Sequence, residues 1–155
     1  MHRLSCLVAL LFCLVLAVPS FAASQNIPNL SADGVLDIVK ANKGKLVFVN
    51  FFATWCPPCR EELPELISLR KDFPEDKVVI ISVSLDTERG KLEPFVNKMK
   101  FNYPVYLATP EVGDRFQIDS IPFNLLYDKK GELVAGGPGM VGKEDLEEAF
   151  NSLLQ

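Results

Sequence analysis

Two cysteines that stand two residues apart, Cys56 and Cys59, are the side chains best suited to chemistry in this sequence. They follow an apolar segment, 45–52, and begin a helical pattern, so we expect them at a strand-to-helix turn. Two intervening residues let the sulfurs meet across one helical turn, and the free N–H groups and macrodipole of a helix N-terminus favour a thiolate. The spacing predicts thiol–disulfide exchange, with Cys56 as the attacking thiol and Cys59 as the thiol that closes the disulfide.

Both residues between the cysteines are prolines. Pro57 suits the first helical position, where a missing N–H costs nothing. Because Pro58 also lacks an N–H, Cys59 is the first backbone donor available to a thiolate at Cys56. The nearby carboxylates of Glu61 and Glu62 oppose ionisation further, whereas Arg60 acts in the other direction but is expected to be exposed and screened. We therefore expect a reduction potential nearer the reducing end of the range known for such dithiols, about −270 mV, than the oxidising end, about −120 mV.

Two other interpretations of the cysteine pair are a half zinc site and a fixed structural disulfide. A closed zinc site needs four ligands, but the only histidine, His2, and the other cysteines, Cys6 and Cys13, all lie in the first 22 residues. A disulfide that closes so short a loop stabilises little, and a helix N-terminus makes it labile. Both interpretations are weaker than redox catalysis, and no metal or other cofactor is expected.

The first 22 residues resemble a secretory signal peptide. His2 and Arg3 precede an apolar run over 4–18, and Ser20 and Ala22 are small residues placed for cleavage after Ala22. The alternative is an uncleaved membrane anchor, although the run is shorter than the ~20 residues that a spanning helix needs. The sequence predicts an exported protein, in the periplasm or at the outer face of the cytoplasmic membrane.

The remainder, 23–155, has the composition of one globular domain. The whole chain is 48% hydrophobic and 23% charged, which is enough apolar material for a core. Arg3 is the only Lys, Arg, Asp or Glu in the first 22 residues, so the remainder carries 15 basic and 20 acidic side chains, a net charge of −5. A surface that binds nucleic acid by its basic charge is therefore not expected.

Hydrophobic periodicity predicts an alternation of strands and helices. Helices are expected over 31–42, 56–72, 90–100, 110–117 and 142–153, and strands over 45–52, 77–85, 103–107, 123–127 and 132–135. Residues 26–30 are expected to be an irregular lead-in and 136–139 a loop, with Pro94 in the first turn of its helix. Strand 45–52, helix 56–72 and strand 77–85 form a βαβ unit with parallel strands, so the class is α/β with a mixed central sheet.

These features together resemble the thioredoxin fold, and the segment from Asn50 to Glu62, NFFATWCPPCREE, resembles its exported TlpA/ResA branch. The resemblance extends over nearly all of 23–155. It implies a central mixed sheet flanked by helices, with an extra helix and strand inserted between the cysteine helix unit and the terminal hairpin. A peroxiredoxin-type peroxidase is disfavoured, because Thr54 lies two residues before Cys56 instead of three.

The resemblance also implies roles for residues around the cysteines. Ile121 and Pro122 should form a cis-proline turn whose backbone meets an extended substrate, and Trp55 should be an exposed ring beside the active site instead of a core aromatic. Pro57 and Pro58 complete this substrate groove. Glu62 is either a solvated helix acid or, as in the ResA-like branch, an acid that takes part in the proton chemistry of the cysteines.

Two residues depart from the pattern of simple thioredoxins. Asn50 stands where those proteins bury an acid, so we expect that proton acceptor to be missing here. Phe123 and Asn124 follow Pro122, where a threonine is usual, which changes the contacts of the groove.

The function expected from these observations is an exported thiol:disulfide oxidoreductase that reduces protein disulfides. The resemblance suggests apocytochrome c as a client and a membrane thiol-transfer protein as the electron donor. Two alternatives remain at this point. One is an oxidant of the same fold that installs disulfides, and the other is a peptide-binding module whose cysteines stay oxidised.

Overall fold

The computed structural model describes residues 27–155. The proposed signal peptide, 1–22, its cleavage site and the start of the expected domain lie outside these residues. The helices are α1 (Ala32–Ala41), α2 (Pro57–Asp72), α3 (Arg89–Met99), α4 (Val112–Arg115) and α5 (Lys143–Leu154). The strands are β1 (Asn29–Leu30), β2 (Leu46–Phe52), β3 (Val78–Ser84), β4 (Val105–Ala108), β5 (Phe123–Tyr127) and β6 (Leu133–Pro138).

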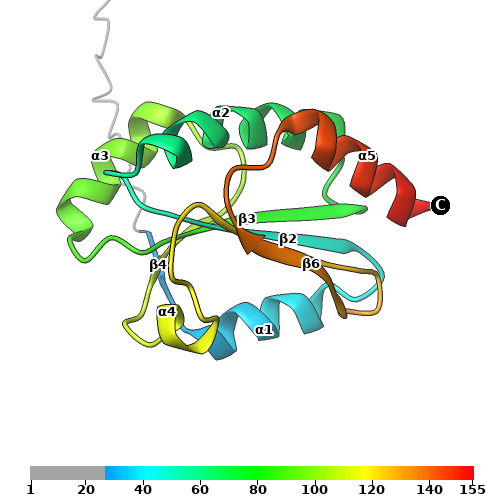
Figure 1. Ribbon diagram of the computed structural model, residues 1–155, viewed down its shortest axis with the longest axis horizontal. Helices are drawn as coiled ribbons and strands as arrows, with labels where there is room; N and C mark the ends of the chain where they lie inside the picture. Colours follow the sequence, from blue (N-terminus) through cyan, green and yellow to red (C-terminus); the bar gives the residue numbers. More distant parts are fainter. Residues whose placement is uncertain (1–26) are drawn as a thin grey trace, which may run out of the picture.

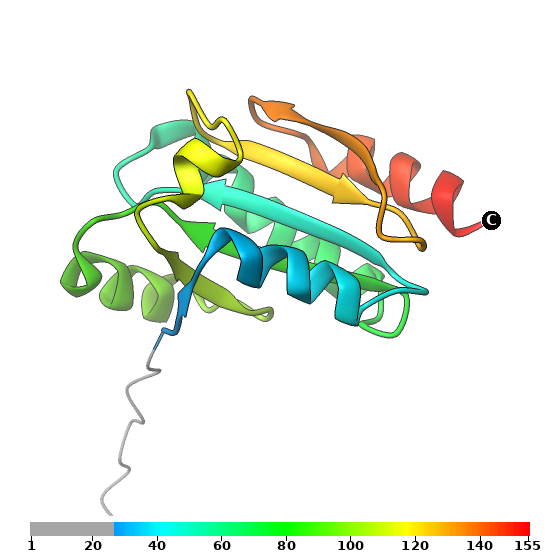
Figure 2. The same ribbon diagram turned by 90° about the horizontal axis from the view of Figure 1, so that it is seen from below.

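The six strands form one mixed sheet in the order β1-β4-β3-β2-β5-β6. The pairs β1–β4, β4–β3 and β3–β2 are parallel, whereas β2–β5 and β5–β6 are antiparallel. Figure 1 shows α2, α3 and α5 over one face of this sheet and α1 and α4 over the other, and Figure 2 shows the second face. The predicted α/β class with a mixed central sheet is confirmed, and α3 and β4 lie where the inserted helix and strand were expected, between the cysteine helix unit and the terminal hairpin.

Strand β2 lies inside the sheet, between β3 and β5, and both of its faces are covered. All seven residues of β2 are buried, as are all seven of β3 beside it. Side chains of a strand alternate between the two faces of a sheet, so Phe48 and Phe52 join the core under α2, α3 and α5, while Val47, Val49 and Phe51 join the core over α1 and α4. The two cores hold the C-terminal end of β2, and with it the cysteine turn, in a fixed place.

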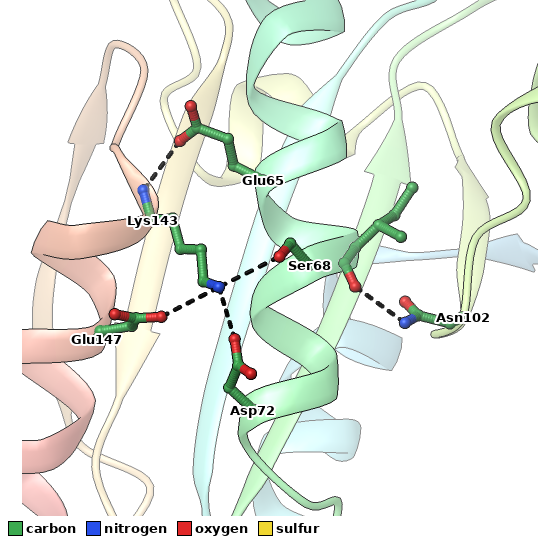
Figure 3. A network of polar contacts seen from close by, with 7 residues as sticks. Glu65, Ser68, Asp72, Asn102, Lys143 and Glu147 are labelled. Carbon is green, nitrogen blue, oxygen red and sulfur yellow. Dashed lines mark hydrogen bonds and ion pairs between the residues drawn. The ribbon is translucent and has the colours of Figure 1, made fainter.

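Polar contacts made by Lys143, the first residue of α5, hold this helix against α2 (Figure 3). Lys143 Nζ lies 2.6 Å from Asp72 Oδ2 and 3.2 Å from both Glu147 Oε1 and Ser68 Oγ. Lys143 also donates its backbone N–H to Glu65 Oε2 at 2.9 Å. These contacts position the loop between β6 and α5 directly beside α2.

Some predicted elements differ from the observed ones. β1 was expected to be irregular, but its two residues pair with Leu107 and Ala108 of β4. α4 is a single turn, shorter than predicted. Pro94 was placed in the first turn of its helix, which is wrong, because α3 begins at Arg89 and Pro94 lies in its interior.

The end of the hairpin also differs, because β6 continues through residues that we expected to form a loop. Gly136, Gly137 and Pro138 pair with Leu125, Asn124 and Phe123, respectively. A proline is tolerated here because β6 is an edge strand. A Cβ at Gly136 would lie 2.6 Å from the Leu125 side chain, so this close approach requires glycine.

Candidate active site

Cys56 is the N-cap of α2, and its backbone is extended, with φ −86° and ψ 112°. It forms a disulfide with Cys59, with a Cα–Cα distance of 5.3 Å. Cys56 Sγ accepts the backbone N–H of Cys59 at 3.3 Å. Pro57 and Pro58 occupy the first turn before that donor, so the cap geometry agrees with the expectation that Cys59 is the first N–H to reach the sulfur.

The two sulfurs differ in their surroundings. Cys59 is fully buried within α2, whereas Cys56, only slightly exposed, lines an open depression of about 440 Å³. Its Sγ lies 3.7 Å from the carbonyl oxygen of Ile121, a distance at which a reduced thiol can point its S–H at that oxygen. Of the two, Cys56 is therefore the thiol that a disulfide in the depression can reach.

We call this depression the cysteine groove. One wall consists of Trp55, Cys56, Pro57 and Pro58, and the other consists of residues 118–121 and Leu85. The ring of Trp55 is 68% exposed. The Ile121–Pro122 bond is cis, and Pro122 itself is buried.

Of the residues predicted for the groove, Trp55, Pro57, Pro58 and Ile121 line it beside Cys56, whereas Pro122 does not. Sequence reasoning missed Leu85 and residues 118–120. The last three directly precede Ile121 in the chain, which is a signal that could have found them. Leu85 carries no such signal, because it enters the groove only through the pairing of β3 with β2.

Glu62 lies on the inner side of α2 and is completely buried. Its Oε1 accepts the side-chain N–H of Asn124 at 2.8 Å and the backbone N–H of Val141 at 2.9 Å. Its Oε2 accepts the side-chain N–H of Asn50 at 2.8 Å. The interpretation of Glu62 as a solvated helix acid is therefore wrong. A buried acid is present after all, supplied by α2 instead of by position 50.

Burial raises the pKa of Glu62, because a buried carboxylate loses its hydration. The hydrogen bonds from Val141, Asn124 and Asn50 oppose this shift, and the charge of Glu65 adds to it. The result is a carboxyl group with a pKa above its ordinary value, held in one orientation one turn beyond Cys59. Such a group can exchange a proton nearer neutral pH than a solvated glutamate can.

The Glu62 site includes a row of polar side chains across three strands. Asn124 of β5 and Ser82 of β3 are the direct cross-strand neighbours of Asn50. Asn50 donates to Asn124 Oδ1 at 2.9 Å and accepts from Ser82 Oγ at 3.0 Å. These contacts fix the orientation of both amides, so that their N–H groups face Glu62. Sequence reasoning missed the row, although polar residues inside apolar strands were a visible signal.

A second buried carboxylate, Asp86, holds the turn that carries Cys56. Thr54 donates its backbone N–H to Asp86 Oδ2 at 2.9 Å and its hydroxyl to Oδ1 at 2.7 Å. Ser84 donates its hydroxyl to Oδ2 at 2.7 Å. Asp86 was not predicted as a site residue, because no motif links it to the cysteines.

The part of the chain from residue 27 onward contains no group of three or more His, Cys, Asp or Glu side chains that could hold a metal ion. Within the same residues, no helix is both long and apolar enough to cross a membrane.

Comparison with known proteins places this site in a family. Residues 17–136 match the AhpC/TSA family. Sporulation thiol-disulfide oxidoreductase A of Bacillus subtilis is 33% identical over 116 residues, which are 72% of this chain and 70% of that protein. Thiol-disulfide oxidoreductase ResA of Geobacillus kaustophilus is 30% identical over 112 residues, which are 72% of this chain and 64% of that protein. The chain thus spans about two thirds of the length of these relatives.

Solved structures show the same relationship. The crystal structure of StoA from Bacillus subtilis matches with a TM-score of 0.62 and 32% identity, over 69% of this chain and 83% of that one. A thioredoxin family thiol:disulfide interchange protein from Chlorobium tepidum matches with a TM-score of 0.68 and 29% identity, over 75% of this chain and 84% of that one.

The fold and the paired cysteines at the start of α2 define a thioredoxin-like protein with a CxxC site. The chain belongs to the AhpC/TSA family and, within it, is a thiol-disulfide oxidoreductase of the ResA/StoA type. The predicted class of enzyme is confirmed.

Proposed function

We propose that this protein reduces disulfides of exported proteins, using Cys56 and Cys59 as the redox centre. In the reduced enzyme, the Cys56 thiolate attacks one sulfur of the client disulfide. The client S–S bond breaks, and its second sulfur leaves as a thiolate that takes up a proton. The first sulfur stays bonded to Cys56 as a mixed disulfide.

The second step releases the client. Cys59 loses its proton and attacks Cys56 Sγ, the mixed disulfide breaks, and the client sulfur leaves as a thiolate that is then protonated. Two electrons have passed from the enzyme to the client, and Cys56 and Cys59 are again joined. In this proposal Glu62, with its raised pKa, accepts the Cys59 proton, because it lies one turn further along the same helix.

The observation that carries the direction of transfer is the cap of α2. The Cys59 N–H is the first backbone donor to reach Cys56 Sγ, because Pro57 and Pro58 have none to offer. A weakly stabilised thiolate makes the dithiol a better reductant. The buried carboxyl group of Glu62 acts in the same direction, since a negative charge near the cysteines opposes their ionisation.

Export is supported by the signal-like composition of residues 1–22. It would place the protein in the periplasm or at the outer face of the cytoplasmic membrane, where disulfides form and reductants must be supplied from inside. A membrane thiol-transfer protein is the proposed electron donor, and apocytochrome c is a client that the family resemblance suggests. The cysteine groove supports protein disulfides as the substrate class, because an extended chain can lie along Ile121.

The test is the reduction potential, measured by equilibrating the protein with defined dithiothreitol and glutathione redox buffers. We expect a value close to the thioredoxin end, about −270 mV, together with reduction of insulin in the presence of dithiothreitol. A potential more positive than about −180 mV would instead favour a disulfide-forming oxidant. A reducing potential without insulin reduction would favour the peptide-binding module.

Pro58→Ala sharpens this test by restoring a backbone N–H in the first turn. A hydrogen bond to a charged group contributes about 1.5–3 kcal/mol, which for a two-electron couple corresponds to roughly 30–60 mV. The variant should become more oxidising by about that amount. An unchanged potential would show that the missing donor does not set the redox poise.

A further inference from the structure

The C-terminal ends of three neighbouring parallel strands meet at one edge of the sheet. β2, β3 and β4 run in the same direction, so the chain leaves all three at the same edge, where open α/β sheets bind their ligands. The cysteine turn follows β2, Leu85 to Thr87 follow β3, and Thr109 to Gly113 follow β4. Of these three segments, the cysteine turn and Leu85 line the cysteine groove, whereas residues 86–87 and 109–113 do not.

A second depression of about 470 Å³ lies next to the cysteine groove. Its walls include Thr87, Thr109, Pro110 and Gly113, and it shares Leu85 with the cysteine groove of about 440 Å³. Because Leu85 lines both, the two depressions adjoin at this side chain. We call the second one the β4 depression.

Few charges are free to act in the β4 depression. Asp86 lines it, but the carboxylate already accepts three hydrogen bonds from Thr54 and Ser84. Arg89, at the start of α3, is bonded to the carbonyl of Ile27 and the side chain of Asn29. The other lining residues carry no charge, which suits an uncharged segment better than a charged one. They are Asn29, Leu85, Thr87, Leu107, Ala108, Thr109, Pro110 and Gly113.

We propose that the β4 depression is a second subsite for the client polypeptide. It binds uncharged residues of the client that lie on one side of the client cysteine. This inference rests on the proposed function, because the occupant is the chain whose disulfide lies at Cys56. Contacts remote from the reacting sulfurs orient the disulfide and contribute to kcat/KM. Small disulfides fill the cysteine groove alone and gain nothing from the subsite.

Gly113 offers a direct way to fill the β4 depression. A Cβ built on Gly113 meets no atom within 4 Å, and the same holds for Gly90. Gly90 lies in α3 and lines neither depression. Gly113→Leu therefore fills the subsite, while Gly90→Leu is its matched control.

The experiment compares two substrates with the full protein. One is glutathione disulfide, and the other is a synthetic peptide whose single cysteine is joined to a small thiol and flanked by several uncharged residues on both sides. Gly113→Leu should lower kcat/KM for the peptide about tenfold, as expected for losing an apolar contact, and leave the value for glutathione disulfide unchanged. Gly90→Leu should change neither. Peptides shortened on one side at a time should show that the loss depends on one side only.

Equal kcat/KM for the peptide with wild type and Gly113→Leu would overturn the subsite, as would an equal loss for both substrates. Thr87→Leu fills the depression from its other wall and gives the same readout if Gly113→Leu does not fold. If wild type reduces neither substrate, the proposed function fails instead, so the two failures are distinguishable.

Discussion

The two sides of the active site are built in opposite ways. The outer side, made of Trp55, Pro57, Pro58 and Ile121 around Cys56, is largely exposed and presents rings and a backbone carbonyl. The inner side, made of Glu62, Asn50, Asn124 and Val141 beyond Cys59, is mostly buried, and its donors all face one carboxylate. The outer side can admit many polypeptides, whereas the inner side allows one arrangement of hydrogen bonds.

This difference suggests a division of labour between the cysteines. Binding a variable client needs surface that tolerates different side chains, and moving a proton needs a group whose position and pKa are fixed. The helical turn from Cys56 to Cys59 serves both client binding and proton transfer, because it puts Cys56 on the outer side and Cys59 on the inner side. Substitutions on the two sides should therefore have effects of different kinds.

The largest difference is expected between Cys56→Ser and Cys59→Ser. Both changes should abolish turnover, but only Cys59→Ser keeps the attacking thiol while removing the one that resolves the mixed disulfide. Mixed disulfides with clients should then accumulate in cells that produce Cys59→Ser and not in cells that produce Cys56→Ser. Purification under non-reducing conditions and mass spectrometry would identify them. If Cys56→Ser traps clients equally well, the roles assigned to the two sulfurs are reversed.

A smaller effect, on stability, is expected for Asn124→Ala on the inner side. The change removes one donor to Glu62 Oε1 and the acceptor of one Asn50 N–H. Leaving buried polar groups unsatisfied costs about 1–3 kcal/mol each, so the free energy of unfolding of the oxidised protein should fall by at least that amount. Urea titration measures it. Asn97→Ala, at an exposed position of α3, is the control and should change stability by less than about 0.5 kcal/mol.

The buried carboxyl group should also make stability depend on pH. The pKa of Glu62 is raised in the folded protein, so between about pH 4.5 and that raised value the folded state binds more protons than the unfolded state. The free energy of unfolding should fall there as pH rises, by at most about 1.4 kcal/mol per pH unit. Glu62→Gln should lack this component. Parallel slopes for the two oxidised proteins would contradict the raised pKa.

The smallest effect on stability is expected for Trp55→Ala on the outer side. Because the ring is 68% exposed, its removal should change the free energy of unfolding by less than about 0.5 kcal/mol. KM for a protein disulfide should rise nevertheless, while reduction of a small disulfide stays the same. A loss of more than about 2 kcal/mol would mean that the ring supports the fold, as a core tryptophan does.

The outer side could be predicted from the sequence because its residues are close together in the chain. Cys56, Cys59 and the two prolines are fixed by local helix geometry, and the apolar run of β2 made the preceding strand evident. The burial of Glu62 could not be predicted in this way. Helical spacing puts Glu62 near Cys59, but it is Val141, 79 residues away in the chain, that helps to enclose it.

The distinction between local and long-range contacts also explains which elements of the fold were predicted wrongly. β1 has only two residues and exists because β4 offers them a partner, which no local pattern records. The extension of β6 through Gly136 and Pro138 was missed because these residues are typical of loops, and only the antiparallel pairing with β5 shows that they continue the edge. Elements defined by their own periodicity were predicted, whereas elements defined by a neighbour were not.

The attachment of α5 across α2 has a consequence for how the protein matures. Chains are synthesised from the N-terminus, so Cys56 and Cys59 emerge about 85 residues before α5, which begins at Lys143. Until residues 141–154 arrive, Glu62 lacks the Val141 bond, and the anchors that Lys143 makes to Glu65 and Asp72 are missing. The nascent chain thus contains both cysteines before the contacts that bury and orient Glu62 have formed. A nonsense mutation or proteolytic cut near the C-terminus should yield a protein with an intact CxxC sequence but an unfinished reactive centre.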